Sequence, residues 1–89
     1  MKLKYEFIVR EIVGEYVLVP VGEAALNFGG MITTSEVGAF LMDALKIGAS
    51  RQTLVDAVLA EYDVDAETAE KDVDEFLANL TELGILENE

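Results

Sequence analysis

The sequence contains no cysteine and no histidine among its 89 residues. Without cysteine the chain has no disulfide framework, no redox dithiol and no zinc ribbon. Without histidine it lacks the commonest general base and the commonest ligand of transition metals. Its serines have no histidine to activate them as nucleophiles, and lysine is scarce. We therefore expect a protein that is not an enzyme and that needs no metal ion or other cofactor.

Long apolar runs are missing as well. The longest cover about six residues, whereas a membrane-spanning helix needs about 20. Lys2 and Lys4 are followed by Glu6 rather than by the apolar segment of a signal peptide. These features predict a cytoplasmic protein with no membrane partner. The hydrophobic fraction of 52% still supplies a real core, so we expect the chain to fold as one domain.

Basic residues are few, and the charge is unevenly distributed. The net charge is −12, with 18 carboxylates against six lysines and arginines. Residues 56–89 hold 12 of these carboxylates and one basic residue, Lys71. This charge repels phosphates, so we expect no nucleic-acid partner, and it would steer a cationic partner toward the C-terminal helices. The ordinary alternative is a solvated surface that keeps the protein soluble.

The first third of the chain alternates apolar and polar residues, as strands do. The pattern predicts a strand over residues 5–13, a two-residue type II′ turn at Gly14 and Glu15, and a return strand over residues 16–19. A short third strand is expected at residues 30–34. Together these strands would form a small antiparallel meander that needs helices for its stability.

From residue 35 onward, apolar residues recur every three or four positions, as on one face of a helix. The pattern predicts three helices, over residues 35–47, 51–62 and 66–83. The element order is therefore β-β-β-α-α-α, and the fold class is α+β and winged-helix-like, with a three-stranded antiparallel meander followed by three α-helices.

Helix boundaries are marked by capping residues. Thr33, Thr34 and Ser35 are all competent N-caps of the first helix, and Thr33 and Glu36 have the spacing of a capping box. Ser50 and Asp65 are the expected N-caps of the second and third helices. Gly48 and Gly84 are suited to end the first and third helices in a left-handed conformation.

A calcium site is one alternative for the acidic residues near position 65. Asp63, Asp65 and Glu67 resemble the start of an EF-hand loop, but Thr68 stands where that loop needs glycine, and Asp74 stands where it needs glutamate. Capping and first-turn positions explain these acids better.

A winged-helix transcriptional regulator is the rival function, and a structural protein-interaction module is another. A DNA-reading helix needs basic or amide side chains toward the groove. The third helix has Lys71 and Asn79 among many carboxylates, so its charge disfavours DNA.

Several blocks of the sequence together resemble the PqqD family. They are residues 10–22 (REIVGEYVLVPVG), 30–32 (GMI), 36–40 (EVGAF), 61–64 (EYDV), 72–77 (DVDEFL) and 83–86 (LGIL). The resemblance spans residues 5–86, and it implies that residues 1–89 form a single PqqD-like winged-helix peptide-binding domain. One departure is Thr34-Ser35, where the family usually has Leu-Asn.

The resemblance implies a non-catalytic peptide chaperone, also called a RiPP recognition element, that serves natural product biosynthesis. Such a protein binds the leader of a ribosomally synthesised precursor peptide and delivers it to a modifying enzyme, often a radical SAM maturase. It leaves open whether the product is pyrroloquinoline quinone or another peptide.

The resemblance places the leader on the third strand and in the groove against the third helix. An edge strand with free amide and carbonyl groups can accept an extended peptide, which supports the same location. For Val73 and Phe76 the alternative is core packing, and for Asp72 and Asn79 it is plain solvent exposure. The predicted peptide-binding residues are Gly30, Met31, Ile32, Thr33, Thr34, Asp72, Val73, Phe76, Asn79 and Leu80.

The unpaired edge strand and the net charge act in opposite directions on self-association. An open edge favours dimers formed by strand pairing or by swapping of the N-terminal hairpin, whereas a charge of −12 keeps copies apart. We expect a monomer in sedimentation velocity at low micromolar concentration. A protein that sediments only as a dimer there would contradict this prediction.

Overall fold

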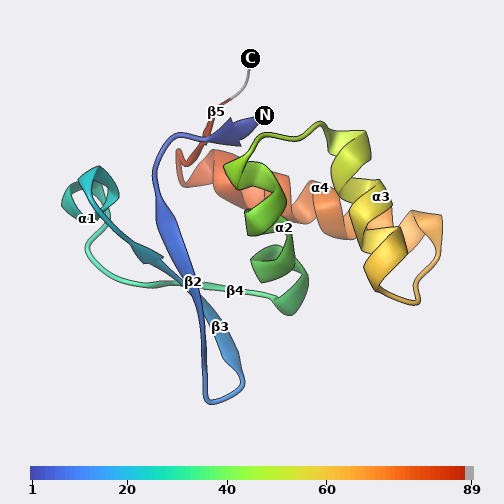
Figure 1. Ribbon diagram of the computed structural model, residues 1–89, viewed down its shortest axis with the longest axis horizontal. Helices are drawn as coiled ribbons and strands as arrows, with labels where there is room; N and C mark the ends of the chain where they lie inside the picture. The colour runs from blue at the N-terminus through green and yellow to red at the C-terminus, as the bar shows by residue number, and fades with distance from the viewer. Residues whose placement is uncertain (88–89) are drawn as a thin grey trace.

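The computed structural model describes residues 1–87 as a three-stranded antiparallel sheet with helices packed beside it (Figure 1). Its elements are β1 (Lys2–Leu3), β2 (Phe7–Ile12), β3 (Glu15–Pro20), α1 (Glu23–Asn27), β4 (Ile32–Thr34), α2 (Glu36–Lys46), α3 (Arg51–Glu61), α4 (Ala66–Glu82) and β5 (Leu86–Glu87). β2, β3 and β4 form the sheet in that order, and β1 pairs with β5 separately. The predicted α+β class, with a three-stranded antiparallel sheet followed by three long helices, is confirmed. The structure adds β1, β5 and α1, which are too short for periodicity to indicate.

The β2–β3 hairpin is built around apolar residues that face the core. Phe7 is 1% exposed and pairs with Pro20, while Val9 pairs with the buried Leu18. Ile8, on the opposite face of β2, is exposed, as the alternation predicted.

The hairpin turn lies one residue earlier than expected. Its two loop residues are Val13 and Gly14, with φ of 50° and 81°, and Ile12 pairs with Glu15. Two positive φ values are typical of a type I′ turn, so the predicted II′ turn at Gly14 and Glu15 is wrong. The reason is register, because the predicted turn would place Leu18 opposite Glu11 rather than opposite Val9.

Each long helix begins with a side-chain cap. Ser35, Ser50 and Asp65 accept hydrogen bonds from the amides three residues on, at 3.0, 3.1 and 2.8 Å. The caps at Ser50 and Asp65 are confirmed. The capping box of Thr33 and Glu36 is wrong, because Ser35 is the N-cap and the residue three positions later is a glycine.

α2 and α4 end just before the glycines that were expected to stop them. Gly48 and Gly84 both have positive φ, and the Ile85 amide donates to the Leu80 carbonyl at 3.0 Å. This last bond closes a Schellman motif and turns the chain back from α4.

The two ends of the described chain lie side by side above the helices (Figure 1). Leu3 pairs with Leu86, and the Lys4 amide donates to the Ile85 carbonyl at 2.7 Å. The Met1 ammonium donates to the Ala49 carbonyl at 3.0 Å. These bonds tie the end of α4 to the loop between α2 and α3.

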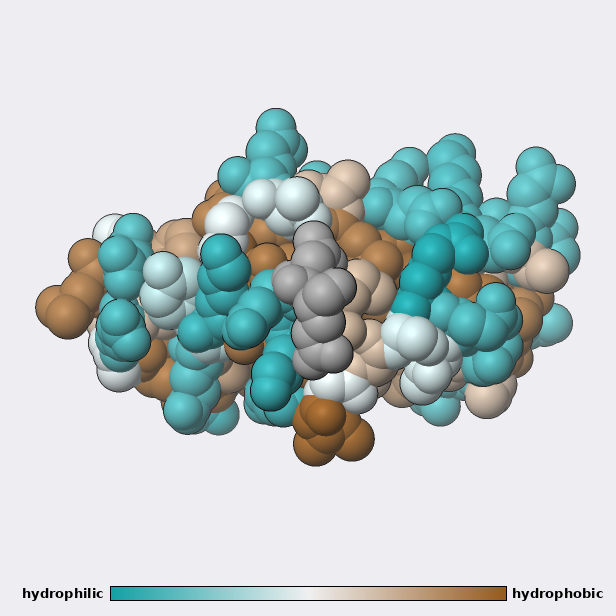
Figure 2. Space-filling model, turned by 90° about the horizontal axis from the view of Figure 1, so that it is seen from above, coloured by the Kyte–Doolittle hydropathy of each residue, from teal (hydrophilic) through white to brown (hydrophobic). Residues whose placement is uncertain are grey.

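Apolar side chains from the sheet and the three long helices meet in one core. Most of the surface seen from the side of the chain ends is hydrophilic, and apolar side chains show mainly between the polar ones (Figure 2). No helix within residues 1–87 is long and apolar enough to cross a membrane. The largest fully buried side chains are Phe7, Leu18, Leu41, Met42, Leu45, Leu54, Ile85, Val58 and Val73.

α1 lies in the segment between β3 and β4, and it projects at the left end of the molecule (Figure 1). Phe28, which follows α1, packs edge-on against Tyr5 with ring centroids 5.4 Å apart and also contacts Phe7. Leu26 on α1 is 87% exposed. The aromatic contacts anchor this connection to the hairpin.

Replacing Val13 by asparagine should raise the free energy of unfolding by about 1 kcal/mol, because a β-branched residue is strained at positive φ and asparagine is not. Urea unfolding followed by circular dichroism measures the change. Ile47→Asn is the control, since Ile47 is also exposed but has φ of −97°. A V13N protein no more stable than wild type would contradict the turn described here.

Candidate functional site

β4 is the outer strand of the sheet next to the helices. It pairs with β3 through Tyr16↔Thr34, Val17↔Thr33 and Leu18↔Ile32. Within residues 1–87 no strand pairs with its other edge. β4 therefore presents one row of main-chain groups to solvent.

The ladder of β3 determines which residue of β4 faces outward. The Val21 amide donates to the Glu6 carbonyl at 3.2 Å, and in an antiparallel ladder bonded pairs alternate with unbonded ones. Counting back from Val21, every second residue of β3 therefore bonds to β2, and the residues between them direct their N–H and C=O groups toward β4. Leu18 is one of these, and it faces Ile32. Because Ile32 and Thr34 direct their main-chain groups toward β3, those of Thr33 point to the open edge.

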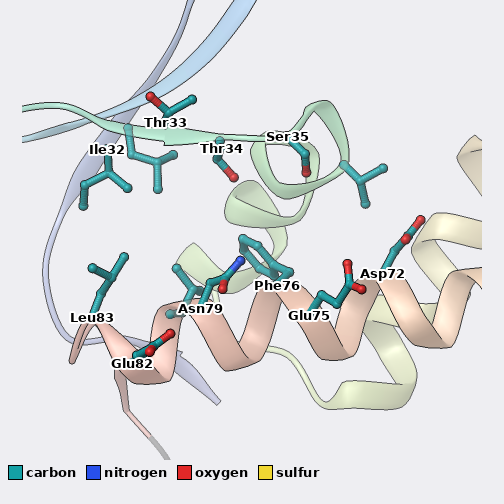
Figure 3. A pocket seen from close by; sticks show the side chains of 13 residues that line it. Ile32, Thr33, Thr34, Ser35, Asp72, Glu75, Phe76, Asn79, Glu82 and Leu83 are labelled. Atoms are coloured by element: carbon teal, nitrogen blue, oxygen red, sulfur yellow. The ribbon is translucent and has the colours of Figure 1, made fainter.

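A groove of about 550 Å³ runs between β4 and α4. Figure 3 shows Ile32 above Leu83 at one end, and Ser35 above Glu75 toward the other. Its floor is apolar, its rim on α4 is acidic, and no lysine or arginine lines it. The lining residues are Leu18, Ile32, Thr33, Thr34, Ser35, Val37, Asp72, Glu75, Phe76, Asn79, Leu80, Glu82 and Leu83.

Seven of the ten predicted residues line this groove. Val73 does not, because it is 0% exposed in the core. Gly30 and Met31 lie in a smaller hollow of about 300 Å³ beside Phe28. The residues that the structure brings together are Ile32, Thr33, Thr34, Asp72, Phe76, Asn79 and Leu80.

The sequence reading missed six lining residues. Helical spacing could have predicted Glu75 and Glu82, because both lie on the same side of α4 as Asp72. Leu18 and Val37 carry no such signal, since only the strand register and the start of α2 bring them to the groove. The six are Leu18, Ser35, Val37, Glu75, Glu82 and Leu83.

Gly38 sets the depth of the groove next to α2. A methyl group there would collide with Thr34 Oγ1 and lie 3.2 Å from Phe76 Cδ1 and 3.3 Å from Ser35 Oγ. Glycine therefore lets the first turn of α2 approach β4 and α4 closely, so that Phe76 forms part of the groove floor.

Negative charge surrounds the end of the groove where α2 begins. Burial and the carboxylate of Glu36 raise the pKa of Tyr62, and partial desolvation with Glu11 and Glu36 raises the pKa of Tyr16. In both cases the nearby carboxylates disfavour the charged phenolate.

Arg51 forms an ion pair with Asp74, a carboxylate outside this groove. Its Nε lies 2.7 Å from Asp74 Oδ1 and its Nη2 lies 2.9 Å from Asp74 Oδ2, and this guanidinium lowers the pKa of Asp74. Asp74 is thus already paired and does not line the groove. In the part of the chain that the structure describes, no group of three acidic side chains is placed to hold a metal ion.

The family model of coenzyme PQQ synthesis protein D (PqqD) matches residues 15–86. The chain belongs to the PqqD family. The match covers β3, β4, the long helices and hence every residue that lines the groove. No protein of curated function is matched by the sequence.

Two solved structures resemble this PqqD-family chain over almost its full length. One is TbiB1 in complex with the TbiA(beta) leader peptide, at 29% identity and a TM-score of 0.71, covering 100% of this chain and 98% of that one. The other is lasso peptide synthetase B1 complexed with the leader peptide, at 21% identity and a TM-score of 0.65, covering 94% and 93%. The second likeness, at this identity, shows a shared fold.

Replacing Gly38 by alanine should lower the free energy of unfolding by about 1–2 kcal/mol, although alanine is about 1 kcal/mol better in a helix, because overpacking costs more. Amide shifts should move at Thr34 and Phe76. Gly29→Ala is the control, since a methyl group there meets no atom within 4 Å. A stable G38A protein with unshifted Thr34 and Phe76 would contradict this account of the groove.

Proposed function

We propose that this chain is a non-catalytic peptide chaperone that binds the leader of a ribosomally synthesised precursor peptide. The leader adds as a strand to the open edge of β4 and packs its side chains in the groove against α4. The chain then delivers the precursor to a modifying enzyme, which is a radical SAM maturase or another peptide-modifying enzyme.

The single observation that carries this proposal is the open edge of β4 beside an apolar groove. Main-chain bonds to an edge strand give affinity without regard to sequence, while pockets for alternate side chains give selectivity. Thr33 supplies an outward N–H and C=O, and Ile32, Phe76 and Leu80 supply apolar contacts on the inward side.

The expected strength follows from the small size of the edge. Each edge hydrogen bond contributes a net of about 0.5–1.5 kcal/mol, and each well-buried apolar side chain about 1.5–3 kcal/mol. After the cost of ordering the peptide, a dissociation constant between nanomolar and micromolar is expected. Apolar anchors of the leader must therefore supply much of the affinity.

The comparisons support the same function. TbiB1, at 29% identity over the whole of this chain, is a protein whose structure contains a leader peptide. Family membership covers the residues that form the open edge and the groove. The acidic side of α4, with Asp72, Glu75 and Glu82, speaks against the rival function of DNA binding, because it would face phosphates with like charge.

Replacing Thr33 by proline tests the proposal, because it removes the outward amide without removing a β3–β4 bond. The probe is a labelled leader peptide that binds the wild-type protein. Loss of one edge bond and distortion of its neighbours should weaken binding at least tenfold in fluorescence anisotropy.

Glu11→Pro is the matched control. Glu11 pairs with Tyr16 at an unbonded position of the ladder, so its amide faces the outer edge of β2. E11P should bind the leader as wild type does. If T33P fails to fold, the α-hydroxy acid analogue at position 33, made by chemical ligation, removes the same N–H. Wild-type affinity in a folded protein without this N–H would refute the proposed pairing.

A further inference from the structure

The charged residues of the groove are all acidic, and they are gathered on α4. Asp72, Glu75 and Glu82 line it, and the remaining polar lining residues are neutral. Lys71 is on the same helix but does not line the groove. The ion pairs within 4.0 Å among residues 1–87 join Lys46 to Asp43 and Arg51 to Asp74, so none neutralises these three carboxylates.

Asp72 and Glu75 form a like-charge pair at one end of the groove. They are three residues apart on α4, which places them side by side on the helix surface, where like charges repel. Figure 3 shows both side chains rising from α4 on the side toward β4. A cation between them would relieve this repulsion.

The nearby start of α2 does not supply that positive charge. Its N-terminal amides carry a partial positive charge, but the Ser35 hydroxyl already accepts from the Gly38 amide and Glu36 lies in the first turn. The carboxylate of Glu36 therefore adds negative charge at the start of α2.

The opposite end of the groove is mostly apolar. Ile32 lies above Leu83 there (Figure 3). Leu80, which also lines the groove, is buried. Leu83 is 43% exposed, so it offers apolar surface that the chain itself leaves uncovered. Glu82 stands beside it without an acidic partner in the lining three or four residues away.

Resting on the proposed function, we propose that the groove selects leaders that carry a lysine or arginine facing Asp72 and Glu75, and an apolar residue facing Ile32, Leu80 and Leu83. The occupant is a cationic, partly apolar extended peptide. Charge complementarity at one end and apolar contact at the other determine which peptides bind and how they are placed along β4.

The helix and strand dimensions predict the spacing of the two leader residues. The midpoint of Asp72 and Glu75 lies about 12 Å along the α4 axis from the midpoint of Leu80 and Leu83, at about 1.5 Å per residue. A strand advances about 3.3 Å per residue and turns every second side chain to the same face. The basic and apolar residues should therefore be four positions apart, with the residue midway between them facing Phe76 and Asn79.

Selection from a displayed library of random dodecapeptides tests this inference without knowledge of the natural leader. Peptides enriched by the wild type, and lost with T33P, are the groove binders. They should carry lysine or arginine four positions from an apolar residue. Selection on D72N/E75Q should lose this preference, and selection on the control D56N/E15Q, which makes the same charge change on α3 and β3 outside the groove, should keep it.

One enriched peptide is then used to measure how much the basic residue contributes to the binding affinity. Replacing its basic residue by norleucine should weaken binding about three- to tenfold at low salt, as expected for partly exposed ion pairs. D72N/E75Q should weaken the parent peptide by the same factor and leave the norleucine peptide unchanged. Raising the salt concentration should shrink the difference.

The outcomes separate this inference from the proposed function. Groove binders without an excess of basic residues, or with the same excess on D72N/E75Q, overturn the charge preference and leave the proposed function standing. A library from which no peptide depends on the Thr33 amide overturns both.

Discussion

The junction at which β4 ends and α2 begins determines the geometry of the groove. Ser35 ends the strand and caps the helix with a 3.0 Å bond from Gly38, so the chain turns from one element into the other without a loop. Gly38 then lets α2 pack closely against Thr34 and Phe76. β4 is therefore held over α4 while, among residues 1–87, strands bond to only one of its edges.

Two kinds of recognition meet at this junction. The outward main-chain groups of Thr33 can bond any extended peptide, so they supply affinity and little selectivity. The side chains of α4 differ along the groove, with carboxylates at Asp72 and Glu75 and apolar surface at Leu83. In the function that we propose, the side chains of α4 select among the extended peptides that the edge of β4 accepts.

Features that depend on neighbouring residues, such as helix caps, could be predicted from the sequence. Features that depend on how distant elements pack or pair were predicted less well. Ser50, Asp65 and Gly84 act locally, and helical periodicity placed Phe76 and Leu80 on the apolar side of α4. Periodicity could not show which flank of that stripe borders the sheet. Val73, at the centre of the stripe, was placed in the groove by the family resemblance, with core packing as the alternative, and it lies in the core.

The hairpin turn was predicted one residue too late, at Gly14 and Glu15, because the alternation of apolar residues does not fix the strand register. The sequence alone does not show that Val9 must pair with Leu18. Ile32 and Thr33 are both among the predicted peptide-binding residues, but their main-chain groups face opposite ways. Strand alternation turns the Ile32 amide toward β3 and leaves that of Thr33 at the open edge.

Amide hydrogen exchange, resolved by residue and measured with and without a leader peptide that the protein binds, tests the central claim most directly. Binding on β4 should slow exchange of the Thr33 amide more than tenfold, because a new hydrogen bond protects it, and should leave the outward amide of Glu11 on β2 unchanged. A bound leader that protects Glu11 and leaves Thr33 exchanging at its free rate would contradict the account.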